Sequence, residues 1–400
     1  MDIIIFAVAD FPDGFATAER IKLLSKALIE KGQNVKVCLI HPTRNDTGSR
    51  NKNVKGIYED IYFEYMNGAT VRPNNKIITV WDTIKGVVFS SFFLIRNIFG
   101  GDLKFVIFYT PNFFKVAPLV FISKIFRTPV IFEFCEIRSS GGSENKKGLL
   151  RVASSYGDSL SERLASHMAS GIIAISRPIK NFFQNKGVGG ERICLVPALA
   201  EFDKNQDGLE EIPDLKDKKY FLSSGSFGPK EGVETILSAF SIVAGAEKNV
   251  YLAFTGAPPE RVKRKLQALI RELNLEGRIL FLGYISRNEL IWCYRNAVAL
   301  LACRCFSPFA EYGFPTKFVE YLSAARPVIV TNVGDPHTYV EDGVNGFVAE
   351  HGSPESIADK MLEVLCLVDG GHEVGRRGEE MARKYFDFSH YGSRILELIK

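Results

Sequence analysis

Two lysines and two glutamates stand where they could bind a phosphorylated, hydroxylated ligand. Lys230 and Lys317 can each donate charge-assisted hydrogen bonds to a diphosphate. Glu320 would repel phosphate, but its carboxylate can accept hydrogen bonds from two hydroxyl groups. Glu311 lies nine positions before it, in EYGFPTKFVE. A phosphate site beside a polyol site describes a nucleotide, in which a diphosphate is followed by a ribose.

Two glycine-containing loops would bring backbone groups to such a ligand. In ADFPDGFATAER, Gly14 allows a tight turn ahead of a helix. In SSGSFGPKEGVE, Gly225 and Ser226 follow a strand, and Lys230 precedes an amphipathic helix. Neither loop has GxGxxG or Walker A spacing. Each can also be interpreted as an ordinary turn, the second with a solvated lysine.

A third loop, FSPFAEYGFP, leads into the helix TKFVEYLSAA. The backbone N–H groups of Thr316, Lys317 and Phe318 would then lie at a helix start, where the helix dipole favours an anion by about 0.3–1 kcal/mol. That contribution is modest, so the lysine charges would have to supply most of the affinity for a diphosphate.

Strands and helices alternate around these loops. Continuous apolar runs such as IIIFAVA, FVIFY and PVIFEF are typical of strands in a parallel sheet with helices on both faces. The segment 200–219 is polar and is expected to be a linker, and a second alternating half follows it. We predict an α/β protein with two Rossmann-like, doubly wound domains that face each other across a cleft. Ligands of such sheets bind at the carboxyl ends of the strands.

Bulk composition limits the class of protein. The 400 residues, 46% of them hydrophobic, are enough for two packed domains. A net charge of +4 is too small to indicate nucleic acid binding. Seven dispersed cysteines without a CxxC pair are typical of reduced thiols in a cytoplasmic protein. The start MDIIIFAVADF has a strand-long apolar run without a basic segment, which argues against a signal peptide.

One segment has the composition of a membrane-associated helix. GVVFSSFFLIRNIF, Gly86–Phe99, is too short in its uninterrupted apolar run to span a bilayer, which takes roughly 20 residues. We expect a buried helix here. The alternative is a surface helix resting on a bilayer, aided by Lys85, Arg96 and Lys104.

The strand end IFEFCEIRSS carries two further carboxylates, Glu133 and Glu136. They could bind an acceptor molecule, or they could cap the end of the strand. The glycine- and serine-containing stretch that follows, RSSGGSENKKGLLR, is expected to form a loop on the same side or to be disordered.

From about Lys219 to Leu367 the chain resembles the retaining nucleotide-sugar glycosyltransferases of family 4, the glycosyl transferases group 1. These have the two-domain GT-B fold. The segments that carry the resemblance are GSFGPKEGVETILSAF, RILFLGYISRNELIWCYRNA, FPTKFVEYLSAARPVIVTNVGD and VEDGVNGFV. The first half is similar more loosely, through GFATAERIKLLSKALIEKGQNVKV and ERLASHMASGIIAIS.

The resemblance implies roles for particular residues. The glutamate matching Glu320 holds the ribose of the donor, and the helix start at Thr316 and Lys317 cradles its diphosphate. A lysine near Lys230 neutralises the diphosphate. The domains implied are an acceptor-binding domain 1–200, a linker 201–218, a nucleotide-sugar domain 219–385 and a C-terminal helix 386–400 packing back on the first domain.

The sequence departs from the family pattern in three places. The family has two glutamates eight apart, and Tyr312 occupies the first position, with Glu311 one residue earlier. Ser226 stands where the glycine-rich loop has an arginine. The histidine that often follows the central strand of the first domain is absent from IFEFCEIRSS.

The reaction implied is transfer of a sugar from a nucleotide diphosphate sugar to a hydroxyl of a saccharide or lipid-linked saccharide. The anomeric configuration is retained, and neither metal nor cofactor takes part; the sequence has no DxD motif. Catalytic contributions are expected from Lys230, Lys317 and Glu311. By analogy the setting is cell-surface polysaccharide or glycolipid synthesis, in the cytoplasm or at the inner face of the membrane. A nucleotide-sugar epimerase and a non-catalytic binding protein are the alternatives.

Overall fold

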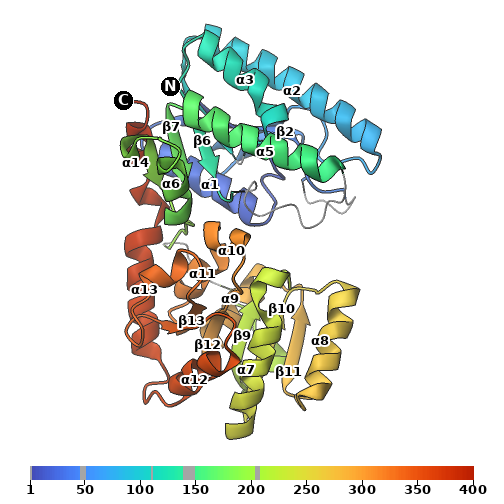
Figure 1. Cartoon of the computed structure of the whole chain (residues 1–400), viewed down its shortest axis with the longest axis vertical. Coiled ribbons are helices and arrows are strands. Elements are labelled where there is room, and N and C mark those ends of the chain that lie inside the picture. Colours follow the sequence, from blue (N-terminus) through green and yellow to red (C-terminus); the bar gives the residue numbers. More distant parts are fainter. Residues whose placement is uncertain (1, 46–50, 110, 138–148, 203–207) are drawn as a thin grey trace. The chain divides into compact units, whose positions relative to one another are not determined.

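The structure is a computed structural model of the chain that describes residues 2–45, 51–109, 111–137, 149–202 and 208–400. The glycine- and serine-containing stretch at 138–148, and part of the expected linker, lie outside the described residues. The chain divides into two compact units: residues 1–199 with 388–400 form unit 1, and residues 200–387 form unit 2 (Figure 1). Each unit is an α/β domain, as the alternating strand and helix pattern predicts.

Eight described strands of unit 1 form one sheet in the order β3-β4-β2-β1-β5-β6-β7-β8. Neighbouring strands are parallel except for β3 and β4. The strands are β1 Asp2–Val8, β2 Asn34–His41, β3 Lys55–Tyr58, β4 Ile61–Tyr65, β5 Leu103–Tyr109, β6 Val130–Phe134, β7 Gly171–Ala174 and β8 Ile193–Leu195. The helices are α1 Ala16–Ile29, α2 Lys76–Phe99, α3 Phe113–Ile125, α5 Leu149–Met168, α6 Arg177–Gln184 and α14 Gly392–Glu397.

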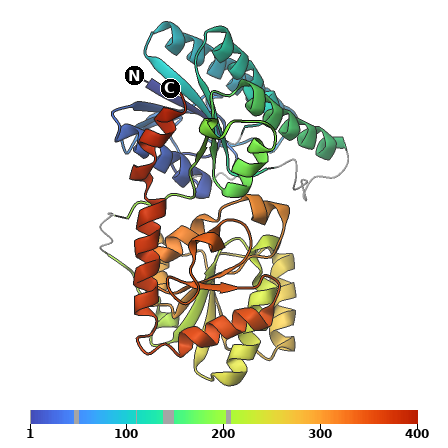
Figure 2. The ribbon, with the colours of Figure 1, turned by 60° about the vertical axis from the view of Figure 1, so that its left-hand side comes forward.

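Both faces of this sheet are covered, which is why its central strands are continuous apolar runs. Alternate residues of β1 point to opposite faces, so Ile3 and Ile5 pack with α1 while Phe6 stacks on Phe108 on the other side. The terminal helix α14 lies against α1: a Cβ at Gly392 would be 2.0 Å from the Ala27 carbonyl oxygen. Figure 2 shows this last segment of the chain running along unit 1.

Six described strands of unit 2 form an all-parallel sheet in the order β11-β10-β9-β12-β13-β14. The strands are β9 Lys219–Ser224, β10 Val250–Thr255, β11 Ile279–Gly283, β12 Ala299–Ala302, β13 Val328–Thr331 and β14 Phe347–Ala349. The helices are α7 Val233–Ala246, α8 Glu260–Glu272, α9 Arg287–Asn296, α10 Pro308–Tyr312, α11 Thr316–Leu322, α12 Pro354–Leu365 and α13 His372–Phe386.

Helix α7 shows how the sequence pattern builds unit 2. Its apolar positions Ile236, Leu237, Phe240 and Val243 are fully buried and pack in one core with residues of β9, α8 and α12. This is the face that the apolar spacing of VETILSAFSIVA predicts.

The expectation of a buried helix around residues 86–99 is wrong. The helix is longer than expected, beginning at Lys76, and only Gly86, Ser90 and Leu94 of its 24 residues are buried. The apolar side chains on its other side are exposed, Trp81 and Phe92 to 67% and 66%. Composition cannot separate these cases, because a buried helix and a surface helix with an apolar outer face use the same residue types.

Candidate active site

Three loops meet at the carboxyl edge of the unit 2 sheet. Strands β9, β12 and β13 are neighbours and run parallel, so their carboxyl ends share one edge. The loops that follow them hold residues 225–232, 303–315 and 332–335. In doubly wound sheets ligands bind at this edge. The two loops of this unit that the sequence analysis singled out, SSGSFGPKEGVE and FSPFAEYGFP, therefore lie where a ligand of such a sheet is expected.

The loop after β9 depends on two glycines. Gly225 has φ +151° and Gly232 has φ +65°, both in the region that favours glycine. A Cβ at Gly232 would also come within 2.5 Å of the Cys303 carbonyl oxygen. The loop therefore packs directly against the backbone that follows β12, and this contact sets its position.

Lys317 crosses from α11 to this loop. Its ammonium group donates to the carbonyl oxygen of Ser224, 3.1 Å away, and forms an ion pair with Glu231. Both side chains of the ion pair are only 12% exposed. The lysine that the sequence places at a helix start thus reaches the carboxyl end of β9.

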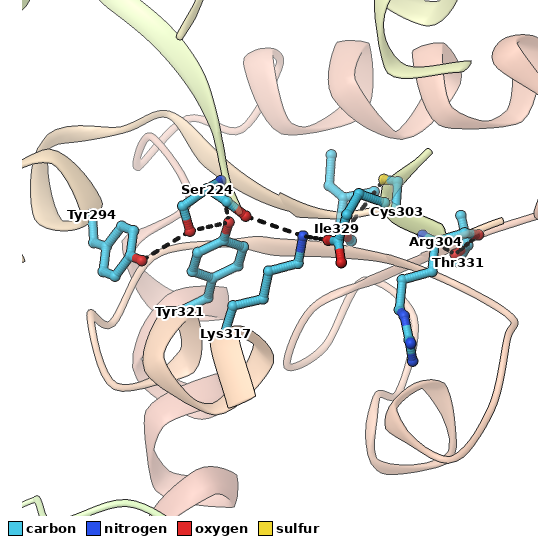
Figure 3. A network of polar contacts seen from close by, with 9 residues as sticks. Ser224, Tyr294, Cys303, Arg304, Lys317, Tyr321, Ile329 and Thr331 are labelled. Atoms are coloured by element: carbon cyan, nitrogen blue, oxygen red, sulfur yellow. Dashed lines mark hydrogen bonds and ion pairs between the residues drawn. The ribbon is translucent and has the colours of Figure 1, made fainter. Parts of the chain in front are cut away.

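A buried hydroxyl network fixes the position of Ser224 (Figure 3). The Ser224 N–H donates to the Tyr321 hydroxyl at 2.7 Å, and the Ser224 hydroxyl lies 2.9 Å from the hydroxyls of both Tyr321 and Tyr294. Burial raises the pKa of both tyrosines, so they remain neutral hydrogen-bonding groups at ordinary pH. The network orients the Ser224 carbonyl that holds Lys317.

Electrostatics keeps Glu231 ionised. Burial by itself would raise the pKa of this carboxyl, but the charge and hydrogen bond of Lys317, with smaller contributions from Arg304 and Lys230, bring its pKa below the ordinary value. The pair is therefore a true ion pair. Sequence reasoning missed Glu231, although it is the residue next to Lys230.

Arg304 is a second residue that sequence reasoning missed. It follows β12 and is 5% exposed, and its guanidinium Nη1 donates to the carbonyl oxygen of Ala310 at 2.9 Å. Its backbone N–H donates to the Thr331 hydroxyl at 2.7 Å. Burial lowers its pKa, with Glu231 and Glu311 opposing that effect. The sequence feature that could have identified Arg304 is its place as a single arginine directly after the apolar run VALLAC.

Glu311 lies on the short helix α10 and is half-buried. Its carboxylate accepts a hydrogen bond from the Gly334 N–H at 3.1 Å. Gly334 has φ +65°, and a Cβ there would lie 2.6 Å from the Ala310 carbonyl oxygen. One carboxylate oxygen of Glu311 thus ties α10 to the turn that follows β13.

Glu320 lies on α11 and is half-buried. It accepts a hydrogen bond from Nη1 of Arg287 at 3.0 Å, and the two side chains are 31% and 63% exposed respectively. An exposed ion pair of this kind contributes about 0–1 kcal/mol, so it leaves Glu320 free to exchange its partner for ligand hydroxyls.

The predicted helix start is only partly available to an anion. The Phe318 N–H donates to the Pro315 carbonyl oxygen at 3.1 Å, and the Phe318 side chain is fully buried. The expectation that the Phe318 amide faces a ligand is therefore wrong, because α11 begins with a tight turn that uses this donor. Thr316 is half-buried at the first position of the helix.

Lys230 and Ser226 are exposed on the loop after β9. Lys230 lies in a short turn, Pro229–Glu231, and its carbonyl oxygen accepts from the Cys305 N–H at 3.1 Å. Between the two, Phe227 is buried against Phe254 and Phe281 and anchors the loop.

In unit 1, Gly14 precedes α1, and a Cβ there would be 2.5 Å from the Asp10 carbonyl oxygen. Glu136 is half-buried after β6. Glu133, expected on the acceptor side, is fully buried and paired with Arg20 at 2.8 Å. The expectation for Glu133 is therefore wrong. Arg20 neutralises the Glu133 carboxylate inside the domain, and the buried side chain has no exposed surface that an acceptor could contact.

Two α/β units with parallel sheets, one following the other along the chain, define the GT-B fold. Solved structures support this over the whole chain. A sucrose-phosphate synthase from Thermosynechococcus elongatus superposes with a TM-score of 0.72 at 16% identity, covering 99% of this chain and 98% of that one. HepE of Anabaena in complex with UDP gives 0.68 at 16% identity, with 99% of each chain covered.

Within this fold, residues 205–380 match the family model of the Glycosyl transferases group 1. Among curated relatives, the alpha-1,3/1,6-mannosyltransferase ALG2 of Dictyostelium discoideum is 25% identical over 201 residues, which are 46% of each protein. The chain thus spans about half the length of the curated relatives it matches.

Proposed function

We propose that this protein is a retaining glycosyltransferase of family 4. It moves a sugar from a nucleotide diphosphate sugar to a hydroxyl of a saccharide or lipid-linked saccharide. The observation that carries the proposal is Lys317, held at the carboxyl end of β9 by Ser224 and Glu231 within the segment that matches the group 1 family. That is where a donor diphosphate would lie in this fold.

The chemistry follows from where charge develops. As the bond between the sugar and the diphosphate breaks, the anomeric carbon becomes oxocarbenium-like and the diphosphate oxygens gain negative charge. Lys317, held at this edge by Ser224 and Glu231, stabilises that charge as the diphosphate shares or replaces the Glu231 carboxylate, and exposed Lys230 adds a second cation. In the proposed front-face route, the acceptor hydroxyl attacks from the side of the leaving group and passes its proton to the departing diphosphate. No metal ion is required in this route.

Glu320 is proposed to bind the ribose hydroxyls after releasing Arg287. Glu311 is proposed to contact the donor sugar through the carboxylate oxygen that does not bind Gly334. The names of similar proteins support a saccharide product: one is a mannosyltransferase, and another a lipopolysaccharide N-acetylglucosaminetransferase of Salmonella typhimurium, 21% identical over 240 residues. We place the reaction in cell-surface polysaccharide or glycolipid synthesis, in the cytoplasm or at the inner membrane face.

A two-stage experiment tests the proposal. Thermal shift with UDP, GDP and ADP, and then with their sugars, identifies the donor, because binding to the folded state raises Tm. The selected donor is next incubated with and without saccharide and lipid-linked acceptors, and the product anomer is assigned by NMR. Transfer with retention supports the proposal. Conversion of the donor sugar without an acceptor would indicate an epimerase, and donor binding without turnover would indicate a binding protein.

A further inference from the structure

Helix α2 exposes its large apolar side chains on the side that faces away from the rest of unit 1. The residues that pack against unit 1 are Gly86, Ser90 and Leu94, spaced four apart. The opposite side carries an exposed row with helical spacing, made of Ile77, Trp81, Ile84, Val88, Phe92 and Phe99. A helix stabilised only by its own domain would place such residues inward.

Helix α3 packs beside α2 and continues the pattern (Figure 1). Its buried residues include Val116, Leu119 and Val120, whereas the exposed row consists of Phe114, Pro118, Phe121 and Ile125, the last being 74% exposed. The rings of Phe99 and Phe126, both exposed, lie 5.2 Å apart and join the two rows at one end. We call these two rows, with Phe126, the α2–α3 face. Exposed apolar surface of this extent on one side of a domain marks an interaction surface.

The charges on these two helices are strongly biased. They include five basic residues and one acidic residue, Asp82, a net charge of +4; the basic residues are Lys76, Lys85, Arg96, Lys115 and Lys124. The whole chain also has a net charge of +4, so the remainder is neutral by the same count. Lys85 and Arg96 are exposed beside the apolar row, where their charged ends can reach lipid headgroups while their stems cover apolar surface.

We propose that the α2–α3 face rests on a bilayer that contains anionic lipids, with both helices lying in the plane of the interface. Apolar side chains, with a tryptophan among them, would enter the boundary between headgroups and acyl chains, and the flanking basic residues would contact anionic headgroups. The net charge distinguishes this partner from a second copy of the chain, because a symmetric dimer would bring two surfaces of +4 together.

Packing indicates that α2 lies on the membrane and does not cross it. In the described part of the chain, α2 is the one helix that is long and apolar enough to span a bilayer. However, a Cβ at Gly86 would be 1.9 Å from the Ile40 carbonyl oxygen, so the middle of α2 is in direct backbone contact with β2. A spanning orientation would require that contact, and the packing on α3, to be broken.

Vesicle co-sedimentation of the full chain tests the proposal. Vesicles of equal parts phosphatidylcholine and phosphatidylglycerol should bind the protein, phosphatidylcholine alone should bind it more weakly, and salt should weaken the first interaction. The triple variant Trp81→Ser, Val88→Ser and Phe92→Ser should partition roughly a hundredfold more weakly, because apolar burial supplies most of interfacial binding. All three side chains are exposed, so the fold should survive.

A control variant removes three exposed apolar side chains elsewhere in the chain. Ile57 on β3, Ile242 on α7 and Val368 after α12 are all exposed, and replacing the three by serine should leave vesicle binding unchanged. Equal loss in both triple variants would overturn the proposal, as would a wild-type protein that does not bind either kind of vesicle. The assay contains no sugar donor, so its outcome does not depend on the proposed transferase activity.

Fluorescence then locates the surface. The chain has two tryptophans, and Trp292→Phe leaves Trp81 as the reporter. Its emission should shift to the blue with anionic vesicles and be quenched by brominated acyl chains. An unshifted spectrum on bound vesicles would contradict insertion of this face. Analytical ultracentrifugation tests the alternative of a second copy. If the wild type is a dimer that does not bind vesicles, and the triple variant is a monomer, the face belongs to a second copy and the proposal is overturned.

Discussion

Lys317 of helix α11 and Glu231 of the loop after β9 form an ion pair, with the Ser224 carbonyl oxygen as the third member, 3.1 Å from the lysine. Glu231 follows β9 in the chain, and Lys317 comes from α11, 86 positions later. Both side chains are mostly buried, and the pair connects α11 to the loop after β9. A diphosphate that binds Lys317 would have to share or replace the carboxylate, and Glu231 therefore positions the lysine while competing for it.

We expect Lys317→Ala to lower kcat/KM for the proposed transfer by roughly a hundredfold, about 3 kcal/mol, because one preorganised donor to the developing charge is lost. The measurement is steady-state transfer with the donor found by thermal shift. Lys263→Ala on α8, an exposed lysine of the same unit, is the control. An unchanged kcat/KM in a folded Lys317→Ala protein would remove Lys317 from the site.

Glu231→Gln should make stability less dependent on pH. The folded-state pKa of Glu231 is below its ordinary value of 4.5. Its ion pair therefore stabilises the fold fully above that ordinary value, and the contribution is lost as the pH falls through the lowered folded pKa. Above pH 5 we expect wild type to exceed Glu231→Gln by about 1–3 kcal/mol in free energy of unfolding.

Urea unfolding from neutral pH down to pH 3.5 measures the effect. The difference between the two proteins should narrow in the acidic part of this range. A difference that stays constant with pH would show that the ion pair does not titrate as described.

The two tyrosines bonded to Ser224 should differ in how much they stabilise unit 2. Tyr321→Phe leaves the buried Ser224 N–H without its acceptor, which should cost about 1–3 kcal/mol. Tyr294→Phe removes one neutral hydrogen bond of the Ser224 hydroxyl, which keeps its contact with Tyr321. We therefore expect a loss of about 0.5–1.5 kcal/mol in the free energy of unfolding. Chemical denaturation of both variants tests the order, and a larger loss for Tyr294→Phe would contradict the assigned donor pattern.

Strands and the loops at their carboxyl ends could be predicted because they follow from local patterns. Runs such as IIIFAVA and VETILSAF have the periodicity of buried strands and one-sided helices, and the structure confirms both. The position of Lys317 could be predicted for the same reason, since a lysine at the start of a helix after Pro315 is visible in the sequence, and the structure has it at the start of α11. The direction in which a side chain points within a short turn cannot be predicted in this way. Nothing in PKEG tells which of Lys230 and Glu231 turns inward, and the partner of Glu231 is far away in the chain.

Contacts that only the fold creates explain two further errors. Glu133 was expected on a ligand surface, but Arg20, 113 positions earlier, neutralises it inside the domain. Arg304 was overlooked because its value as a positioning group depends on the carbonyl oxygens of Ala310 and Gly313, which only the fold brings to it.

The Arg20 and Glu133 pair should therefore affect stability and leave the transfer chemistry intact. Both side chains are almost fully buried, and Arg20 also donates to the carbonyl oxygen of Val196 at 2.7 Å. Glu133→Ala leaves an uncompensated buried guanidinium, which should cost about 3–5 kcal/mol. The KM for the acceptor, measured on the folded fraction, should not change. An altered acceptor KM with unchanged unfolding free energy would restore the acceptor role first expected for this residue.

Glu311 has two roles that one pair of variants can separate. Through the Gly334 N–H it positions the turn after β13, and the side-chain oxygen of a glutamine can also accept that hydrogen bond. If positioning were its whole role, Glu311→Gln would behave like wild type and Glu311→Ala would lose stability by about 1 kcal/mol. The proposed donor-sugar contact requires more: Glu311→Gln should keep wild-type unfolding free energy while raising the donor KM or lowering kcat. Thermal unfolding and donor titration of both variants decide between these outcomes, and wild-type kinetics in Glu311→Gln would leave Glu311 as a positioning residue alone.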